Sequence, residues 1–306
     1  MFRMAEATVT RDESAEEFTC TTLPTPLVET EWLDGHLRER DLRILDCSVV
    51  RKTTSERGYA FVAGREEWEH GHIPGSVFVD VLKDLAARDD PRPMMMPREE
   101  QFADTMGAFG VGENTRVVLY DRSHHAWAAR AWWMLRVCGF DAAAVLNGGW
   151  QKWISEGRRI STEPASYRRG NFRPRHRTGL MATKQEVLDS LHAKGVRLVN
   201  ALSPEEHRGE ETHFARAGRI PGSANVDYQA LVDPQNHAYL PPERLRKLFE
   251  AASAMGADRV ITYCGAGVAA SSDALALILL GKKNVAVYDG SLAEWTADPA
   301  LPMEKD

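Results

Sequence analysis

The chain lacks the features that mark membrane-spanning, exported and metal-binding proteins. No apolar run approaches the roughly 20 residues of a transmembrane helix, so no membrane partner is expected. The first 22 residues are polar and acidic and contain no apolar core of a signal peptide. We therefore expect a flexible tail over residues 1–22 and a cytoplasmic location.

Cysteine is scarce and is not arranged for metal binding. The four cysteines, Cys20, Cys47, Cys138 and Cys264, form no CxxC or other short ligand spacing. In a reducing cytoplasm they are expected to stay free thiols. We expect Cys47 and Cys138 to be small buried apolar residues, and we expect no metal.

The bulk composition is that of an ordinary globular protein. The chain has 306 residues, of which 43% are hydrophobic and 27% are charged, enough for two domains of usual size. The net charge of −6 gives no reason to expect a nucleic-acid partner.

The sequence repeats itself. The offset between matching segments lies between 142 residues (145 to 287) and 154 residues (44 to 198). Because the matches keep the same order in both halves, they indicate two copies of one domain. The matching segments are ILDC at 44–47 with LVNA at 198–201, HIPGS at 72–76 with RIPGS at 219–223, RVVLYD at 116–121 with RVITYC at 259–264, and VLNGGWQKW at 145–153 with VYDGSLAEW at 287–295.

Each copy alternates short apolar runs with helical patterns. Runs rich in valine and isoleucine, at residues 116–120, 259–263 and 285–288, predict buried strands. Residues 126–137 and 271–280 have the length and spacing of helices. This alternation predicts two α/β domains, each with a mainly parallel sheet flanked by helices.

A capping box is predicted at the start of the second copy. Thr183 precedes Glu186 by three residues, the spacing with which a side chain and a backbone N–H satisfy each other at a helix start. The helix is expected to run to about Leu191.

The pattern breaks down between the copies. We place the first domain at residues 23–160, a linker at 161–180 and the second domain at 181–306. Five arginines of the linker form either a solvated charged surface, which we favour, or a cationic cover that attracts an anionic substrate. They are Arg168, Arg169, Arg173, Arg175 and Arg177.

Cys264 stands where chemistry is expected in a parallel sheet. A buried strand ends at Tyr263, small residues follow at 265–269, and a helix is expected to begin near Ala270. Successive N–H groups of such a turn and the helix N-terminus can hold an anion. They favour the thiolate and predict a thiol pKa below the free value of about 8.5.

The sister copy has Asp121 where the second copy has Cys264. Only one copy can therefore form a covalent bond to sulfur. Taken alone, a cysteine followed by small residues is more often structural than reactive, and it is this comparison that favours a reactive thiol.

These motifs resemble the tandem-domain rhodanese-like sulfurtransferases, the group of thiosulfate and 3-mercaptopyruvate sulfurtransferases. The resemblance covers about residues 27–303, through HIPG, LNGGW, the Cys264 loop, and YDGS with EW at 294–295. It implies a silent first copy, a catalytic second copy and a loop, residues 264–269, that cradles the transferred sulfur. The loop residues implied to bind substrate are Gly265, Ala266, Gly267, Val268 and Ala269.

The resemblance also bears on the donor. Thiosulfate enzymes of this group carry Arg and Lys after the cysteine, and mercaptopyruvate enzymes carry Gly and Ser before Gly-Val-Thr. This chain has neither set, so the donor stays open between the two. Arg208 matches a family arginine that binds the anionic end of the substrate, and Arg216 is the nearest candidate for a second one.

The implied reaction is a two-step transfer through a Cys264 persulfide. The donor is a small anionic sulfur compound, the acceptor is cyanide, a thiol or thioredoxin, and no cofactor is required. A sulfur-relay module that serves a protein partner without turning over a small donor is the alternative. A cysteine phosphatase is disfavoured because Ala270 stands where such enzymes need an arginine.

Overall fold

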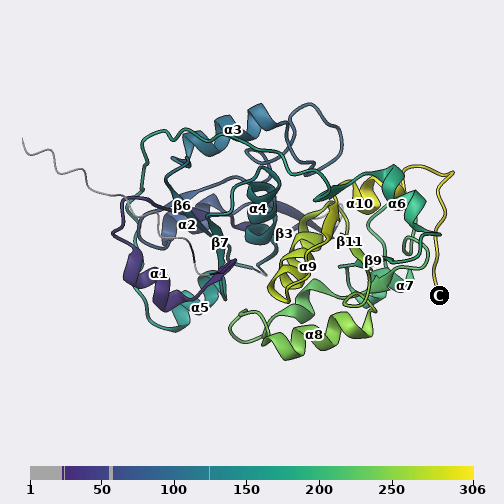
Figure 1. Cartoon of the computed structure of the whole chain (residues 1–306). Coiled ribbons are helices and arrows are strands. Elements are labelled where there is room, and N and C mark those ends of the chain that lie inside the picture. The colour runs from purple at the N-terminus through teal and green to yellow at the C-terminus, as the bar shows by residue number, and fades with distance from the viewer. Residues whose placement is uncertain (1–22, 24, 55–57, 124) are drawn as a thin grey trace, which may run out of the picture.

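A computed structural model describes residues 23, 25–54, 58–123 and 125–306 (Figure 1). The predicted tail, residues 1–22, lies outside the described residues. Two sheets of the same design are arranged side by side, one built from each half of the chain.

The first sheet has five strands in the order β1-β7-β6-β2-β5, and all its neighbouring strands are parallel. An antiparallel hairpin, β3–β4, follows β2. The strands are β1 (Leu27–Val28), β2 (Leu42–Asp46), β3 (Val49–Thr54), β4 (Gly58–Ala63), β5 (Ser76–Phe78), β6 (Arg116–Tyr120) and β7 (Ala143–Leu146). The helices are α1 (Thr30–His36), α2 (Arg65–His70), α3 (Glu99–Ala108), α4 (Ala126–Val137) and α5 (Gly149–Ser155).

The second sheet has five parallel strands in the order β10-β9-β11-β12-β8. The strands are β8 (Met181–Ala182), β9 (Val196–Asn200), β10 (Ala224–Asn225), β11 (Arg259–Tyr263) and β12 (Val285–Tyr288). The helices are α6 (Lys184–Ser190), α7 (Pro204–Arg208), the 3₁₀ helix η1 (Tyr228–Leu231), α8 (Pro242–Ala251), α9 (Val268–Leu279) and α10 (Ser291–Trp295).

The two sheets are copies of each other, because β5, β2, β6, β7 and β1 occupy the places of β10, β9, β11, β12 and β8. The predicted parallel α/β architecture is therefore confirmed. The strands predicted over residues 116–120, 259–263 and 285–288, and the helix predicted over 126–137, have the predicted bounds. The helix expected over 271–280 begins earlier, at Val268.

Only half of the predicted capping box is present. Thr183 accepts a hydrogen bond from the backbone N–H of Glu186 at 3.2 Å. The Glu186 carboxylate accepts instead from Nε of Arg259, at 2.8 Å. Arg259, the first residue of β11, therefore binds the Glu186 carboxylate in place of the backbone N–H at the helix start. A complete capping box lies at Ser203 and Glu206, where the sequence analysis did not expect one.

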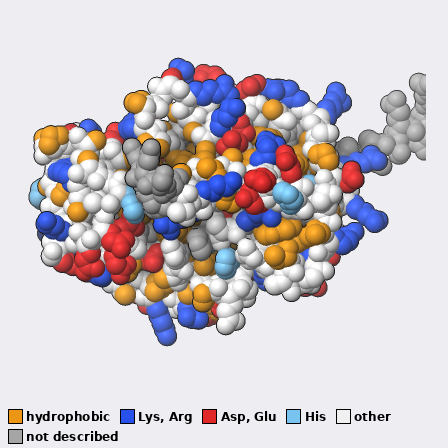
Figure 2. Space-filling model, turned by 180° about the vertical axis from the view of Figure 1, so that it is seen from behind, with side chains coloured by type: hydrophobic (Ala, Val, Ile, Leu, Met, Phe, Trp, Pro, Cys, Tyr) orange, Lys and Arg blue, Asp and Glu red, His pale blue; other side chains and the backbone are white. Residues whose placement is uncertain are grey.

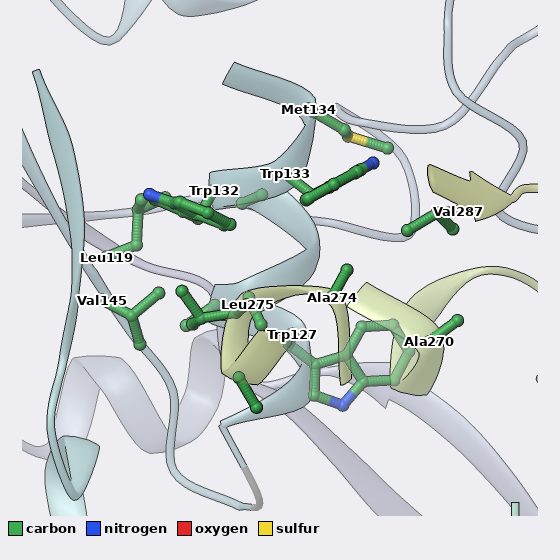
Figure 3. Packing of buried hydrophobic residues seen from close by; sticks show 14 of the residues in the cluster. Leu119, Trp127, Trp132, Trp133, Met134, Val145, Ala270, Ala274, Leu275 and Val287 are labelled. Atoms are coloured by element: carbon green, nitrogen blue, oxygen red, sulfur yellow. The ribbon is translucent and has the colours of Figure 1, made fainter. Parts of the chain in front are cut away.

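The largest hydrophobic cluster lies between the two sheets and joins both halves of the chain. Helices α4 and α9 form its centre: Trp127, Trp133 and Met134 of α4 face Ala270 and Ala274 of α9 (Figure 3). Two smaller clusters cover the outer faces of the sheets and contain Trp153 and Trp295, which are fully buried as core anchors. The molecule is thus layered around a shared central core.

The linker, residues 161–180, runs along the first half of the chain. Tyr167 donates to the carbonyl of Gly75 at 2.6 Å, and Arg177 pairs with Asp141. Arg169 pairs with Asp104. These contacts agree with the favoured interpretation of the linker as a charged surface, and they engage acids of the first half rather than the Cys264 loop.

Cys47 and Cys138 are buried and free, as expected. Acidic and basic side chains are interspersed with apolar ones over the face shown in Figure 2. Among the described residues, no helix is both long and apolar enough to cross a membrane.

Candidate active site

Cys264 directly follows β11, and α9 begins four residues later, at Val268. Its side chain belongs to the central core, and the residue is 2% exposed. Gly267 adopts a left-handed conformation, with φ of 72°, that turns the chain into α9. Gly265, Ala266 and Val268 are half-buried and form the part of the loop nearest to solvent. The loop predicted over 264–269 therefore merges with the first turn of α9.

Ser291 fastens this loop to the start of α10. Its hydroxyl accepts from the backbone N–H of Cys264 at 3.0 Å and of Gly267 at 3.2 Å, and donates to the carbonyl of Tyr288 at 2.7 Å. Backbone bonds from Leu292 to Cys264 and from Ala293 to Gly265 complete the junction. Ser291 belongs to the repeated YDGS segment, but its contact with the Cys264 loop was not predicted. A signal for it exists in the sequence, because a serine replaces Gly149 of the first copy.

The surroundings of the thiol act on its pKa in opposite directions. Burial raises the pKa of Cys264 above its ordinary value, whereas the N–H groups of Ala270, Ala266 and Ala269 and the hydroxyl of Ser291 lower it. Burial prevails, so the expectation of a pKa below about 8.5 is wrong in direction. The hydrogen-bond donors themselves stand where the sequence placed them.

The sister loop shows what these donors hold. The carboxylate of Asp121 accepts from the backbone N–H of Ser123, His125, Trp127 and Ala128, at 3.0 to 3.1 Å. Ser123 is the second residue after Asp121, as Ala266 is after Cys264, and Trp127 and Ala128 are the second and third residues of α4, as Ala269 and Ala270 are of α9. The same turn, with an acid in it, is an anion-binding nest.

The tyrosine before each of these residues explains a second shared motif. The hydroxyl of Tyr263 accepts from the backbone N–H of Ile220 at 3.1 Å and lies 2.6 Å from Oγ of Ser223. Tyr120 makes the matching contacts with Ile73 and Ser76, at 3.3 and 3.0 Å. The IPGS segments therefore fix the strand ends that carry Cys264 and Asp121.

His72 belongs to the same scaffold. Its imidazole is fully buried, and its two ring nitrogens face the carbonyl oxygens of Trp68 and Glu163, at 2.8 and 3.0 Å. It therefore holds the linker to the first domain and lies apart from the Cys264 thiol.

Gly265 lies beneath an aromatic ring. A Cβ atom added at this position would lie 2.6 Å from Cζ of Phe214. The place where thiosulfate enzymes of the resembled group carry an arginine is thus filled from outside by Phe214. No cationic side chain replaces it within residues 264–269.

Arg208 lies at the end of α7, on the surface. Its guanidinium binds both carboxylate oxygens of Glu210, at 2.8 and 2.9 Å, and approaches Glu205 at 3.3 Å. The partners are exposed by 56% and 48%. Ion pairs at this exposure contribute little to stability.

Arg216 has a different environment from the one its predicted role requires. Its guanidinium donates to the carbonyl oxygens of Thr296, Leu301, Trp295 and Asp298, at 2.7 to 3.1 Å. Four of its five N–H groups are thus committed to the chain around the end of α10. The predicted substrate contact of Arg216 has no support among the described residues.

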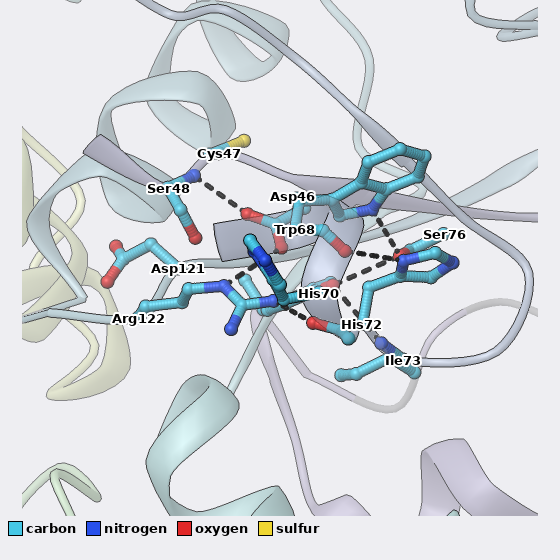
Figure 4. A network of polar contacts seen from close by, with 12 residues as sticks. Asp46, Cys47, Ser48, Trp68, His70, His72, Ile73, Ser76, Asp121 and Arg122 are labelled. Carbon is cyan, nitrogen blue, oxygen red and sulfur yellow. Dashed lines mark hydrogen bonds and ion pairs between the residues drawn. The ribbon is translucent and has the colours of Figure 1, made fainter. Parts of the chain in front are cut away.

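The first copy carries a charged residue, Arg122, directly after Asp121. Arg122 approaches Asp46 at 3.6 Å (Figure 4) and donates to the carbonyl of Gly71. Its guanidinium also stacks on the ring of Trp150 at 4.0 Å. The position after Asp121 is thus a partnered arginine, whereas the matching position after Cys264 is Gly265, beneath the ring of Phe214.

Comparison with known proteins decides the family. The family model of the rhodanese-like domain matches the chain twice, over residues 29–156 and 183–298. The chain belongs to the rhodanese-like family.

Its relatives extend this result. The chain is 34% identical over 279 residues to a thiosulfate sulfurtransferase of Cricetulus griseus, covering 88% of this chain and 91% of that protein. It is 32% identical to the sulfur carrier protein TtuD of Thermus thermophilus, covering 92% and 97%. The crystal structure of SseA from Escherichia coli, described as a rhodanese-fold 3-mercaptopyruvate sulfotransferase, matches with a TM-score of 0.77 and 29% identity, covering 87% and 98%.

This rhodanese-like chain is a sulfurtransferase with two domains of one fold, as its motifs predict. The relatives favour the enzyme over the sulfur-relay module that the sequence left as an alternative. Among the described residues, no group of three or more His, Cys, Asp or Glu side chains is placed to hold a metal ion.

Proposed function

We propose that Cys264 carries the sulfur. One observation supports this above the others: the N–H groups of Ala266, Ala269 and Ala270 act to lower the pKa of its thiol, and the matching turn of the first copy holds a carboxylate. A persulfide bears its negative charge on the outer sulfur, and a nest of this kind stabilises it. In this assignment residues 23–160 form the silent domain, 161–180 the linker and 181–306 the catalytic domain.

The transfer proceeds in two displacements. The Cys264 thiolate attacks the outer sulfur of the donor, a new S–S bond forms, and the donor's bond to that sulfur breaks with its electron pair. Thiosulfate then leaves as sulfite, and 3-mercaptopyruvate leaves as the enolate of pyruvate, which takes up a proton. A thiolate or cyanide attacks the outer sulfur of the persulfide and restores the Cys264 thiolate.

We propose 3-mercaptopyruvate as the preferred donor. Thiosulfate is a dianion, and residues 264–269 offer it no guanidinium or ammonium group. Phe214 lies over Gly265, where such a side chain would have to stand. A monoanionic donor needs one cationic contact, which Arg208 supplies once it exchanges Glu210 for the substrate carboxylate. Gly265, Ala266 and Val268 line the approach.

Cyanide, low-molecular-weight thiols and thioredoxin are the proposed acceptors, since each can present a nucleophile to the outer sulfur. The free state of Cys47, Cys138 and Cys264 agrees with a reducing compartment, and we place the protein in the cytoplasm on that ground.

The decisive test replaces single cysteines. Cys264→Ser is expected to abolish thiocyanate formation from 3-mercaptopyruvate and cyanide, whereas Cys47→Ser and Cys138→Ser retain it. Mass spectrometry after donor treatment should find one added sulfur on the Cys264 peptide alone. Normal turnover by Cys264→Ser would end the proposal.

A further inference from the structure

A buried arginine of the first half of the chain lies against the Cys264 loop. Arg130, on α4, is 1% exposed. Its Nη2 donates to the carbonyl of Met94 at 2.8 Å and lies 2.6 Å from Oδ1 of Asp289, which follows β12 in the second half. Helix α4 delivers the guanidinium because it packs along α9 in the central core (Figure 3).

This pair closes over the turn of the loop. A Cβ atom built on Gly267 would lie 2.9 Å from Nη1 of Arg130 and 2.7 Å from Oδ1 of Asp289. Asp289 is two residues before Ser291, whose hydroxyl holds the N–H groups of Cys264 and Gly267. The Arg130–Asp289 pair therefore contacts the loop directly and also through the segment that fixes it.

The duplicated fold supplies an internal comparison. Asp289 accepts from the backbone N–H of Met96 at 2.7 Å, and at the matching place Asn147 accepts from the backbone N–H of Tyr239 at 2.8 Å. Asn147 follows β7 as Asp289 follows β12. A neutral amide thus serves this backbone contact beside the silent loop. The negative charge of Asp289 is therefore not needed for the hydrogen bond from Met96 that joins the two halves.

We propose that Arg130 is a positioning residue for Cys264. The Arg130 guanidinium neutralises Asp289, so that this carboxylate can support the loop without opposing the negative charge of a thiolate or persulfide. The proposal rests on the assignment of Cys264 as the sulfur carrier. It gives the silent domain a part in the reaction that its own loop no longer performs.

Electrostatics in a dry interior make the effect measurable. Opposite charges interact strongly where water is excluded, and a buried carboxylate that loses its partner is left uncompensated. Arg92 pairs with Asp90 and Glu294 and also interacts electrostatically with Asp289. On the thiol side, Tyr228 interacts electrostatically with Cys264, Asp227 and Asp121. These groups are the same in every variant below and do not account for differences among them.

The test compares the rate of Cys264 alkylation by iodoacetamide as a function of pH in the full chain, read from the mass of the Cys264 peptide. Arg130→Met is expected to raise the apparent thiol pKa by about one unit and Asp289→Asn to lower it by a similar amount. Arg130→Lys should lie near the wild type, and the double variant between the single ones. Asn147→Ala, which removes the matching contact beside the silent loop, should leave the thiol pKa unchanged. With 3-mercaptopyruvate, Arg130→Met should reduce kcat and leave KM nearly unchanged.

The opposite signs separate this role from a structural one. If the pair merely held the loop in shape, Arg130→Met and Asp289→Asn would shift the thiol pKa in the same direction, and that result, or no shift, would overturn the proposal. Should Arg130→Met fail to fold, Asp289→Asn compared with Arg130→Lys distinguishes the two roles, because only the electrostatic role lowers the thiol pKa in Asp289→Asn. Alkylation reports on the thiol without turnover, so an active Cys264→Ser enzyme would reject the proposed function and leave this result readable.

Discussion

The carboxylate of Asp121 occupies, in the first half of the chain, the nest that surrounds the thiol of Cys264 in the second. Four backbone N–H groups donate to Asp121, and three N–H groups and one hydroxyl act on Cys264. The Asp121 loop thus shows how this turn holds an anion, as the Cys264 loop has to do with a thiolate or persulfide.

Removing the Ser291 hydroxyl should weaken catalysis more than folding. Ser291→Ala deletes the acceptor of the Cys264 and Gly267 N–H groups, and we expect kcat/KM to fall by roughly ten- to a hundredfold, about 1–3 kcal/mol for the lost bonds. Ser291→Gly is the matched control, because it also lacks the hydroxyl but relaxes the left-handed backbone at φ of 47°. Equal losses in the two variants assign the effect to the hydroxyl. Wild-type kcat/KM in Ser291→Gly would contradict it.

Donor choice should follow the contact of Gly265 with Phe214. Gly265→Arg alone is expected to destabilise the protein, since a Cβ at this position meets the Phe214 ring. The double variant Gly265→Arg/Phe214→Ala should recover stability and raise kcat/KM for thiosulfate relative to 3-mercaptopyruvate. Steady-state assays with both donors, beside urea unfolding, check both parts. A wild-type enzyme that uses thiosulfate more efficiently than 3-mercaptopyruvate would refute the proposed donor preference.

The two arginines suggested by the sequence should separate into different roles. Arg208→Ala is expected to raise KM for 3-mercaptopyruvate about tenfold, the effect of one lost charged contact, with no change in the urea midpoint. Arg216→Ala removes bonds to four carbonyl groups and should cost about 2–4 kcal/mol of unfolding free energy. Unchanged stability in Arg216→Ala would reopen its role at the substrate.

Sulfur uptake should increase with pH. Burial raises the pKa of Cys264 above its ordinary value, so the thiolate is a minor species at neutral pH. The kcat/KM for the donor is expected to rise about tenfold per pH unit between about pH 6 and 8, in proportion to the thiolate. Because the folded pKa is raised, this group also contributes stability at lower pH that is lost as pH rises through its folded value. A rate that reaches a plateau below pH 7 would show that the N–H groups prevail over burial.

The sequence predicted the features that repeat. The matches around Asp121 and Cys264, and around Gly149 and Ser291, fix strands and turns whose chemistry is local, so the sheets and the loop were foreseeable. Arg216 and Glu186 show the limit, because distant segments decide what their side chains bind. Sequence alone also cannot weigh burial against hydrogen bonding at one atom. The direction of the Cys264 pKa was therefore missed, although its donors were identified.

Helix α9 is buried on nearly every side from Ala269 to Leu277. A helix without a solvent-exposed face cannot be the outer helix of an isolated domain. Here α4 packs over α9 with the large side chains of Trp127 and Trp133. Loss of the first copy would lay bare an apolar surface beside the reactive cysteine and invite aggregation. The first half of the chain is consequently part of the architecture on which the helix after Cys264 depends.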